Sequence, residues 1–181
     1  MHARFIKIMS KYKIKFRGLK EGRYNYKFEI GDMFFENYPE SEIKKAEISA
    51  IVEMLINKDL LTFQISLRGT AELQCDRCLD FFDYPIDYQA VLYADFGDEN
   101  SDLSDADNKI TISNKASDVI FDKHFYDYLH LSLPYQKIHP DDENGETTCN
   151  TKMIEKIEEY SSFKELKNTD PRWDKLKSLY N

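Results

Sequence analysis

Two cysteines separated by two residues, Cys75 and Cys78, place the strongest constraint on how this chain can fold. They are followed much later by His139 and Cys149, so the chain offers three thiols and one imidazole, the ligand types that zinc prefers. A CxxC pair lets two thiolates reach one ion from a single tight turn. If the two distant side chains join this pair, four protein ligands complete a tetrahedral site and leave no position for a catalytic water. Such a site is structural.

The residues alone leave three interpretations of these side chains: a metal site, ordinary free thiols beside an incidental histidine, and a thiol–disulfide redox pair. The distance in sequence from the CxxC to His139 is far longer than in a zinc finger, so spacing does not decide between the first two. The redox interpretation is the weakest, because redox CxxC motifs use a helix N-terminus to lower the pKa of the first thiol. Here Pro85 ends the following segment before a useful helix, and Asp76 opposes thiolate formation.

Length and composition favour a globular protein with one domain. The 181 residues, 41% hydrophobic and 32% charged, are enough to bury a core. No stretch is long and apolar enough to cross a bilayer, and the basic N-terminus lacks the apolar segment of a secretory signal. Three cysteines without such a signal argue against a disulfide framework and predict a cytoplasmic protein with no membrane association. We expect a single domain over 9–181, preceded by residues 1–8 as a loose extension or a mis-assigned start.

Charge is distributed unevenly along the chain. Residues 1–23 carry a net charge of +7, residues 163–181 carry +2, and the residues between them carry −17. A body this acidic repels phosphate backbones, which argues against broad, nonspecific nucleic-acid binding and suits a basic protein partner. Any RNA contact must use the basic ends, with Lys11, Lys13, Lys15 and Arg17 as candidates. The alternative is that these side chains form the solvent face of an edge strand, where lysine discourages aggregation.

The first half of the chain is predicted to be mostly strand, because polar and apolar residues alternate. Residues 11–16 and 24–30 can form a hairpin through the turn at 18–22. An antiparallel pair is predicted over 46–55 and 60–67, a strand over 69–73 leads into the CxxC, and a strand over 84–93 leads out. The CxxC therefore lies at the tip of a strand–turn–strand unit, which is the form of a zinc knuckle.

The second half is predicted to mix short strands and helices. The acidic residues 97–108 are expected to form a mobile loop. Short strands follow over 109–113 and 118–121, and then a helix over 123–133 with Asp122 as its N-cap and Pro134 as its stop. Two short helices, over 153–160 and 172–180, are expected within a helical tail over 151–181. The predicted fold class is α+β, an antiparallel β-rich sheet or partly open barrel with a few short helices and a CxxC knuckle.

No enzyme signature is found in the sequence. His124 and His130 lie in the predicted helix, and neither has a nearby Ser or Cys at a spacing that predicts a nucleophile and its base. The chain has no glycine-rich loop of the kind that cradles phosphates. The sequence therefore predicts a non-enzymatic protein without a small-molecule substrate.

The residues that carry this argument also resemble a known family. Cys-Asp-Arg-Cys-Leu at 75–79 after a glycine-containing strand, the acidic middle, the helix that runs into Leu133-Pro134, and then His139 and Cys149 are similar to the YceD family. The segment 170–179, Asp-Pro-Arg-Trp-Asp-Lys-Leu-Lys-Ser-Leu, resembles the closing helix of that family. The likeness covers most of the chain, from about Met9 onward. The longer loop between His139 and Cys149 departs from the family pattern.

The resemblance implies a role in ribosome biogenesis. Members of this family are bacterial proteins of large-subunit ribosomal RNA accumulation, so the expected role is non-enzymatic support of 23S rRNA accumulation or processing. The expected partners are rRNA or a large-subunit ribosomal protein. Cys75, Cys78, His139 and Cys149 match recurrent Cys/His positions of the family, which favours a bound Zn²⁺. Arg77 matches as well, either as a donor to a thiolate or as an RNA contact. A protein-only adaptor or chaperone for a basic ribosomal protein is the alternative.

Overall fold

The computed structural model describes residues 11–58, 60–97 and 108–161, which form two compact units. The first unit contains the described residues up to 73 together with 81–137, and the second contains 74–80 and 138–161. Residues 1–8, the interior of the predicted acidic loop and the helix expected over 172–180 lie outside the described residues. A single cooperative domain over 9–181 stays a prediction.

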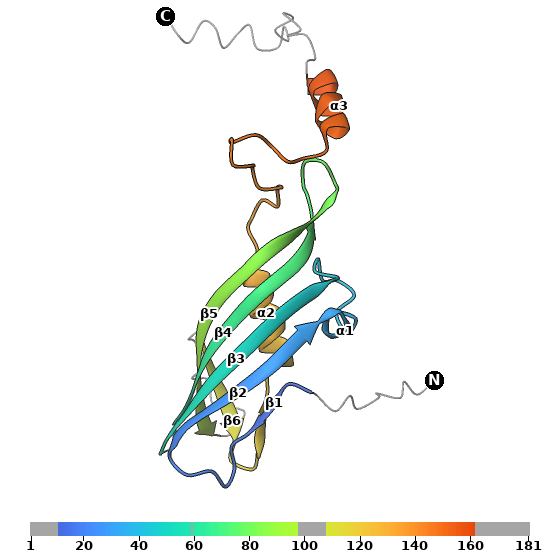
Figure 1. The fold of residues 1–181 in the computed structure, drawn as a ribbon. Coiled ribbons are helices and arrows are strands. Elements are labelled where there is room, and N and C mark those ends of the chain that lie inside the picture. Colours follow the sequence, from blue (N-terminus) through green and yellow to red (C-terminus); the bar gives the residue numbers. More distant parts are fainter. Residues whose placement is uncertain (1–10, 59, 98–107, 162–181) are drawn as a thin grey trace, which may run out of the picture. The chain divides into compact units, whose positions relative to one another are not determined.

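An open, mixed sheet of five strands forms the centre of the first unit, with the order β2-β3-β4-β5-β6 (Figure 1). The strands are β2 (Gly22–Gly31), β3 (Ala46–Asn57), β4 (Leu60–Gln74), β5 (Phe81–Gly97) and β6 (Lys109–Ser113). The pairs β2–β3 and β3–β4 are antiparallel, whereas β6 lies parallel to β5. The predicted β-rich α+β class is confirmed, and the parallel pair is a feature that the alternation of residues did not reveal.

The sheet has one buried and one exposed face because apolar residues recur at every second position of its strands. The buried side chains of its two central strands are Ile48, Ala50, Val52 and Met54 on β3 and Leu61, Phe63, Ile65 and Leu67 on β4. The antiparallel pair predicted over 46–55 and 60–67 is confirmed, and Asn57 lies opposite Leu60 where the two strands are joined.

A separate two-stranded ribbon covers part of the buried face. It consists of β1 (Lys13–Lys15) and β7 (Asp118–Ile120), which pair antiparallel with Ile14 opposite Val119. The hairpin predicted between 11–16 and 24–30 is therefore wrong. Ile14 of β1 is fully buried, and the ring of Tyr12, just before the strand, lies 6.0 Å from that of Phe28 on β2. Covering the apolar face of the sheet buries more surface than extending its edge.

The helix α2 (Asp122–Leu131) packs on the same face through Phe125 and Leu129. The prediction that Asp122 is the N-cap is wrong, because the N-cap position is occupied by Phe121 and Asp122 is the first helical residue. Phe121 is fully buried and lies 5.0 Å from the Phe63 ring, so core packing sets the start of the helix. An acidic residue in the first turn still interacts favourably with the helix dipole.

Two further helices are present among the described residues. The helix α1 (Asp32–Phe35) follows β2 and buries Phe34 and Phe35. The helix α3 (Thr151–Ser161) lies in the second unit and confirms the helix predicted over 153–160. None of the helices within the described ranges is long and apolar enough to span a membrane.

Candidate metal centre

The CxxC forms a tight turn in the second unit, between the end of β4 and the start of β5. The Cys75 N–H donates to the Asp80 carbonyl at 2.9 Å, and the Leu79 N–H donates to the Cys75 carbonyl at 3.0 Å. Leu79 adopts a left-handed conformation with φ of 65°, which turns the chain back after the second cysteine. Both thiols are buried, with exposed fractions of 0% for Cys75 and 1% for Cys78.

The loop between His139 and Cys149 is folded so that its two ends lie together. Asp141 and Thr147 form an isolated β-bridge, and the chain turns at Asn144-Gly145, with Gly145 at φ of 80°. The two ends of the loop meet the knuckle, where the Nδ1 atom of His139 lies 3.4 Å from the Cys78 sulfur. The structure thus brings together the four side chains that the sequence singled out, and their ligand atoms all lie within 4.8 Å of one another.

The separations of these atoms fit one tetrahedral zinc ion. Zn–S bonds of about 2.3 Å place two sulfurs of a tetrahedron about 3.8 Å apart, and a Zn–N bond of about 2.0 Å places sulfur and nitrogen about 3.5 Å apart. The Cys75 and Cys149 sulfurs are 3.8 Å apart, and the His139 Nδ1 atom lies 3.8 Å from the Cys149 sulfur. Three sulfurs and one nitrogen form a donor set typical of structural zinc sites.

The electrostatics of the site favour a thiolate at Cys75. Burial raises the pKa of this thiol, but hydrogen bonds from the backbone N–H groups of Cys78 and Arg77 and from His139 outweigh burial and lower the pKa to about 6. The Arg77 N–H lies 3.4 Å from the Cys75 sulfur. Burial raises the pKa of Cys149. A deprotonated sulfur is the form that binds zinc.

The geometry weighs against the two other interpretations of the cysteines. All three thiols are free, and the Cys75 sulfur lies 3.8 Å from the sulfur of Cys149, which is outside the CxxC. His139 lies against two of the sulfurs, which does not suit an incidental histidine. A low thiol pKa is common to metal sites and redox sites, so it does not separate them.

Side chains around the four ligands link the knuckle to the loop. The Asn150 Nδ2 atom donates to Asp80 at 2.9 Å, and an Arg77 guanidinium nitrogen donates to the Thr147 hydroxyl at 3.4 Å. Asn150 also begins α3, because its Oδ1 atom accepts from the Lys152 N–H at 3.1 Å. One residue next to a candidate ligand therefore both closes the loop onto the knuckle and caps the following helix.

Replacing Asn150 with Ala is expected to destabilise the first turn of α3 by about 1 kcal/mol, the usual effect of losing an N-cap. Hydrogen exchange at the Lys152 amide measures this loss, and metal content should not change. Asn144→Ala is the matched control, because the Asn144 side chain donates to Asp142 within the loop, at 3.4 Å. Equal protection of the Lys152 amide in both variants would contradict the capping role.

The five basic residues predicted to contact RNA fall in three different places. Lys15 and Arg17 are exposed, one on β1 and the other just after it, and Lys13 is the first residue of β1. Lys11 lines a groove rich in carboxylates. Arg77 belongs to the second unit, where its backbone contacts a thiol and its side chain contacts Thr147.

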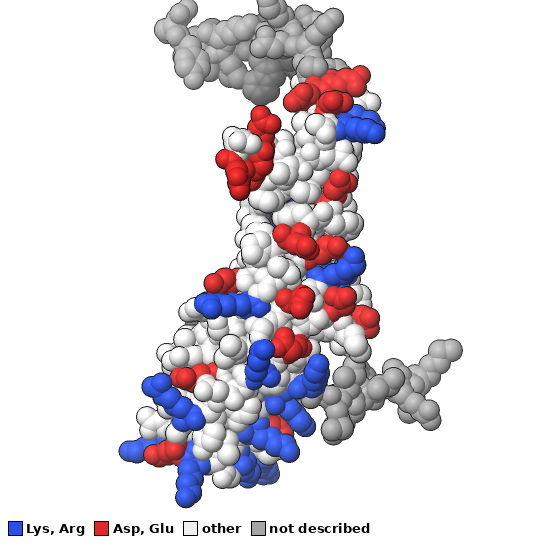
Figure 2. Space-filling view, in the orientation of Figure 1, with Lys and Arg blue, Asp and Glu red and all other residues white. Residues whose placement is uncertain are grey.

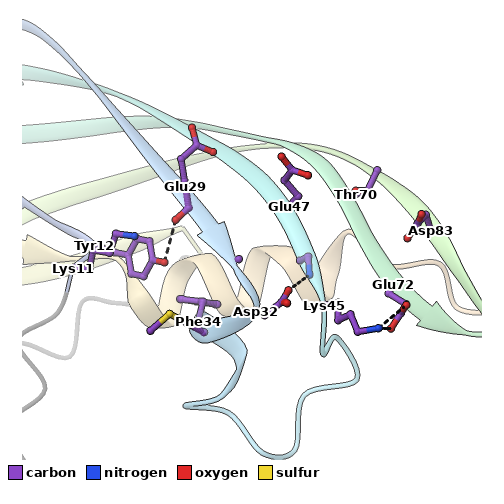
Figure 3. Close-up of a pocket in the computed structure, with 13 residues that line it drawn as sticks. Lys11, Tyr12, Glu29, Asp32, Phe34, Lys45, Glu47, Thr70, Glu72 and Asp83 are labelled. Atoms are coloured by element: carbon purple, nitrogen blue, oxygen red, sulfur yellow. Dashed lines mark hydrogen bonds and ion pairs between the residues drawn. The ribbon is translucent and has the colours of Figure 1, made fainter.

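That acidic groove is a feature the sequence did not reveal. It has a volume of about 750 Å³ and lies in the first unit, beside the C-terminal end of β2 (Figure 3). Its acidic lining comes from four separate segments and comprises Glu29, Asp32, Glu47, Glu72 and Asp83, with Lys11 and Lys45 as its bases. Lys45 pairs with Glu72 at 3.0 Å, and Asp32 accepts from the Ala46 N–H at 2.9 Å. The groove keeps a net negative charge.

A serine and a histidine that sequence spacing could not associate also lie together. The Ser41 Oγ atom lies 3.1 Å from His130 Nε2, and His130 Nδ1 lies 2.9 Å from the Tyr126 carbonyl. Ser41 is only 3% exposed, and its hydroxyl oxygen also accepts from the Ile43 N–H at 3.1 Å. This hydroxyl is enclosed by the turn before β3, so the pair stabilises the turn.

Residues 63–180 match the family model described as "Large ribosomal RNA subunit accumulation protein YceD". The match covers more than half of the chain and includes Cys75, Cys78, His139 and Cys149. No curated protein and no solved structure matches the chain. The name of the family suggests a role in the accumulation of large-subunit ribosomal RNA.

Proposed function

The chain belongs to the YceD family, and from this membership we propose that it is a non-enzymatic ribosome-biogenesis factor that supports accumulation or processing of 23S rRNA. The observation that carries the proposal is the family match, which includes the complete Cys/His cluster. The proposed setting is the cytoplasm, and the proposed partner is rRNA or a large-subunit ribosomal protein.

Zn²⁺ is the proposed cofactor, held by Cys75, Cys78, His139 and Cys149. Four protein ligands complete the coordination of zinc, so the ion would stabilise the second unit without activating water. The buried Ser41–His130 contact does not support an alternative catalytic centre, because its hydroxyl is enclosed. These observations support a protein that recognises a partner and does not transform a substrate.

Depleting the protein is expected to lower the ratio of 23S to 16S rRNA in the cell. The reason is that unprotected or misprocessed large-subunit rRNA is degraded while small-subunit rRNA is unaffected. The ratio is measured by quantifying total RNA after depletion, with complementation by the wild-type chain and by Cys78→Ser. An unchanged ratio after depletion would refute the proposed role. Full complementation by Cys78→Ser would refute the need for the metal.

A second candidate function, an adaptor or chaperone for a basic ribosomal protein, is supported by the acidic groove. Its carboxylates would attract a lysine- or arginine-rich segment. Filter binding to rRNA at increasing salt separates the two candidates. An RNA binder weakens steeply with salt because binding releases counterions, whereas an adaptor that never touches RNA is not retained with it at any salt concentration.

A further inference from the structure

We propose that RNA is bound at one end of the first unit, on a basic rim formed by Lys15, Arg17, Lys20, Lys58 and Lys115. This inference rests on the proposed function and names the surface that meets the RNA. It differs from the sequence-based prediction, since three of its five residues are new and Lys11, Lys13 and Arg77 are not part of it.

Three segments that are distant in sequence meet to form the rim. The Phe16 and Arg17 N–H groups donate to the Ser117 carbonyl at 3.1 and 3.3 Å, which joins the end of β1 to the loop that carries Lys115. The Glu21 side chain accepts from the Lys58 N–H at 3.3 Å, which joins the loop before β2 to the β3–β4 turn. Figure 2 shows the resulting cluster of basic side chains at this end.

The lysines of the rim are available to a ligand. Lys15, Lys20, Lys58 and Lys115 are exposed, and no ion pair joins any of them to a carboxylate among the described residues. The ion pairs at this end engage two other bases, since Arg23 contacts Glu53 at 3.4 Å and Lys109 contacts Asp95 at 2.5 Å.

The other two described carboxylates at this end, Glu21 and Asp118, accept local hydrogen bonds. Glu21 accepts from the Lys58 backbone, and Asp118, which lies opposite Lys15, accepts from the Ser117 hydroxyl at 3.2 Å. Among the described residues, counting these two and the two ion pairs, seven bases face four acids at this end, a net charge of +3.

Arg17 is a positioning residue within the rim. Its Nε atom donates to the Ala116 carbonyl at 3.0 Å, and its Nη2 atom donates to the Asn114 carbonyl. These bonds hold the loop around Lys115 against β1. Lys15, Lys20, Lys58 and Lys115 are therefore the residues expected to contact phosphates, and Arg17 is expected to act through the loop.

The chemistry favours the phosphate backbone of RNA as the partner. Lysine ammonium groups bind phosphate as point charges and carry little base specificity, so the rim would position RNA without reading its sequence. The acidic groove would repel RNA, and Lys11 lines that groove together with five carboxylates, so we expect Lys11 to make no contribution. Because the rim attracts RNA and the acidic groove repels it, we expect the first unit to meet RNA in one orientation, with the rim toward the RNA.

The test compares two triple variants of the full, metal-loaded chain. The rim variant is Lys20→Gln, Lys58→Gln and Lys115→Gln. The control is Lys11→Gln, Lys44→Gln and Lys123→Gln, which removes the same charge from exposed lysines elsewhere in the first unit. Binding to transcripts that tile the large-subunit rRNA is measured by filter binding at salt concentrations from about 0.05 to about 1 M. Over this range the screening of exposed charges goes from weak to strong.

The rim variant is expected to make the negative slope of log K against log salt shallower by about 2, since each lost phosphate contact on a single strand removes about 0.7 from its magnitude. That change corresponds to about 100-fold weaker binding at 0.1 M salt, with the difference vanishing near 1 M. The control triple variant is expected to bind as the wild type does.

Two other outcomes would contradict the proposal, one by refuting the rim and the other by refuting direct RNA binding. If the wild type binds rRNA with a steep salt dependence and the rim variant binds equally well, the rim is wrong and direct RNA binding stands. If the wild type binds no transcript at any salt concentration, the rim and direct RNA contact both fall, and the adaptor function is favoured. Circular dichroism of both variants shows whether a loss of binding reflects a loss of folding.

Discussion

Replacing Cys78 with Ser is expected to abolish stoichiometric zinc binding and to unfold the second unit. The Cys78 sulfur is buried and lies 3.4 Å from His139 Nδ1, and a serine hydroxyl is a poor substitute for a thiolate ligand of zinc. The described residues of this unit bury little besides the cysteines, since α3 has no buried residue. Without the ion, we expect little to hold the knuckle and the loop together.

The expected effect is large because metal binding and folding are coupled in sites of this kind. Structural zinc contributes an apparent free energy of about 10–16 kcal/mol in zinc-finger peptides at neutral pH. We therefore expect elemental analysis to find one zinc per wild-type chain and none in Cys78→Ser. Hydrogen exchange should show loss of protection at the Leu79 amide, which donates to the Cys75 carbonyl in the turn.

His139→Ala and His124→Ala form a matched pair for this experiment. Both histidines are half-buried, but only His139 lies at the cysteines, whereas His124 lies on α2. We expect only His139→Ala to lose zinc. Removing the metal from the wild type with a chelator provides the same test without a substitution. Equal zinc in the wild type and Cys78→Ser would end the site hypothesis, and an intact second unit after chelation would end its structural role.

Gly69→Ala is expected to destabilise the first unit by about 3 to 5 kcal/mol, the sum of backbone strain and overpacking. Gly69 has φ of 156° and lies opposite Ile48 in the β3–β4 pair. A Cβ atom there would lie 2.0 Å from the Glu47 carbonyl oxygen and 2.7 Å from the Ile48 Cα atom. Because both neighbours are backbone atoms, relief requires the two central strands to separate.

Gly22→Ala separates backbone strain from steric overlap. Gly22 has a similar φ of 151°, but a Cβ atom added there would meet nothing within 4 Å. Strain alone should then lower the free energy of unfolding by about 1 to 2 kcal/mol. The midpoints of denaturant unfolding, compared at constant slope, measure both effects. Equal midpoints for the two variants would show that the close approach of β3 to β4 has no energetic consequence.

Local sequence patterns predicted most strands because the period of two is a local property. The β3–β4 pair and the strands on either side of the CxxC could be recognised from alternating residues and short turns. The strand that pairs with β1 could not be recognised from the sequence in this way. Its apolar side chains can bury themselves beside β2 or across the face of the sheet, and the choice depends on the whole core.

The same distinction applies to the start of α2. Asp122 has the chemistry of an N-cap, so the sequence placed the cap there. In the structure Asp122 is instead the first helical residue and Phe121 occupies the N-cap position, because Phe121 must enter the core against Phe63. A side chain's burial, which depends on residues far away in sequence, outweighs a capping preference of about 1 kcal/mol.

The sequence by itself determined which four side chains have the chemistry of a zinc site, because ligand type and the CxxC turn are local properties. It also determined the alternating strands and the excess of base near the N-terminus. Only the tertiary structure decided that His139 and Cys149 return to the knuckle, that Lys58 and Lys115 join Arg17 at one end, and that Lys11 lies among carboxylates. Those outcomes depend on contacts between segments dozens of residues apart, whose free energies no local pattern encodes.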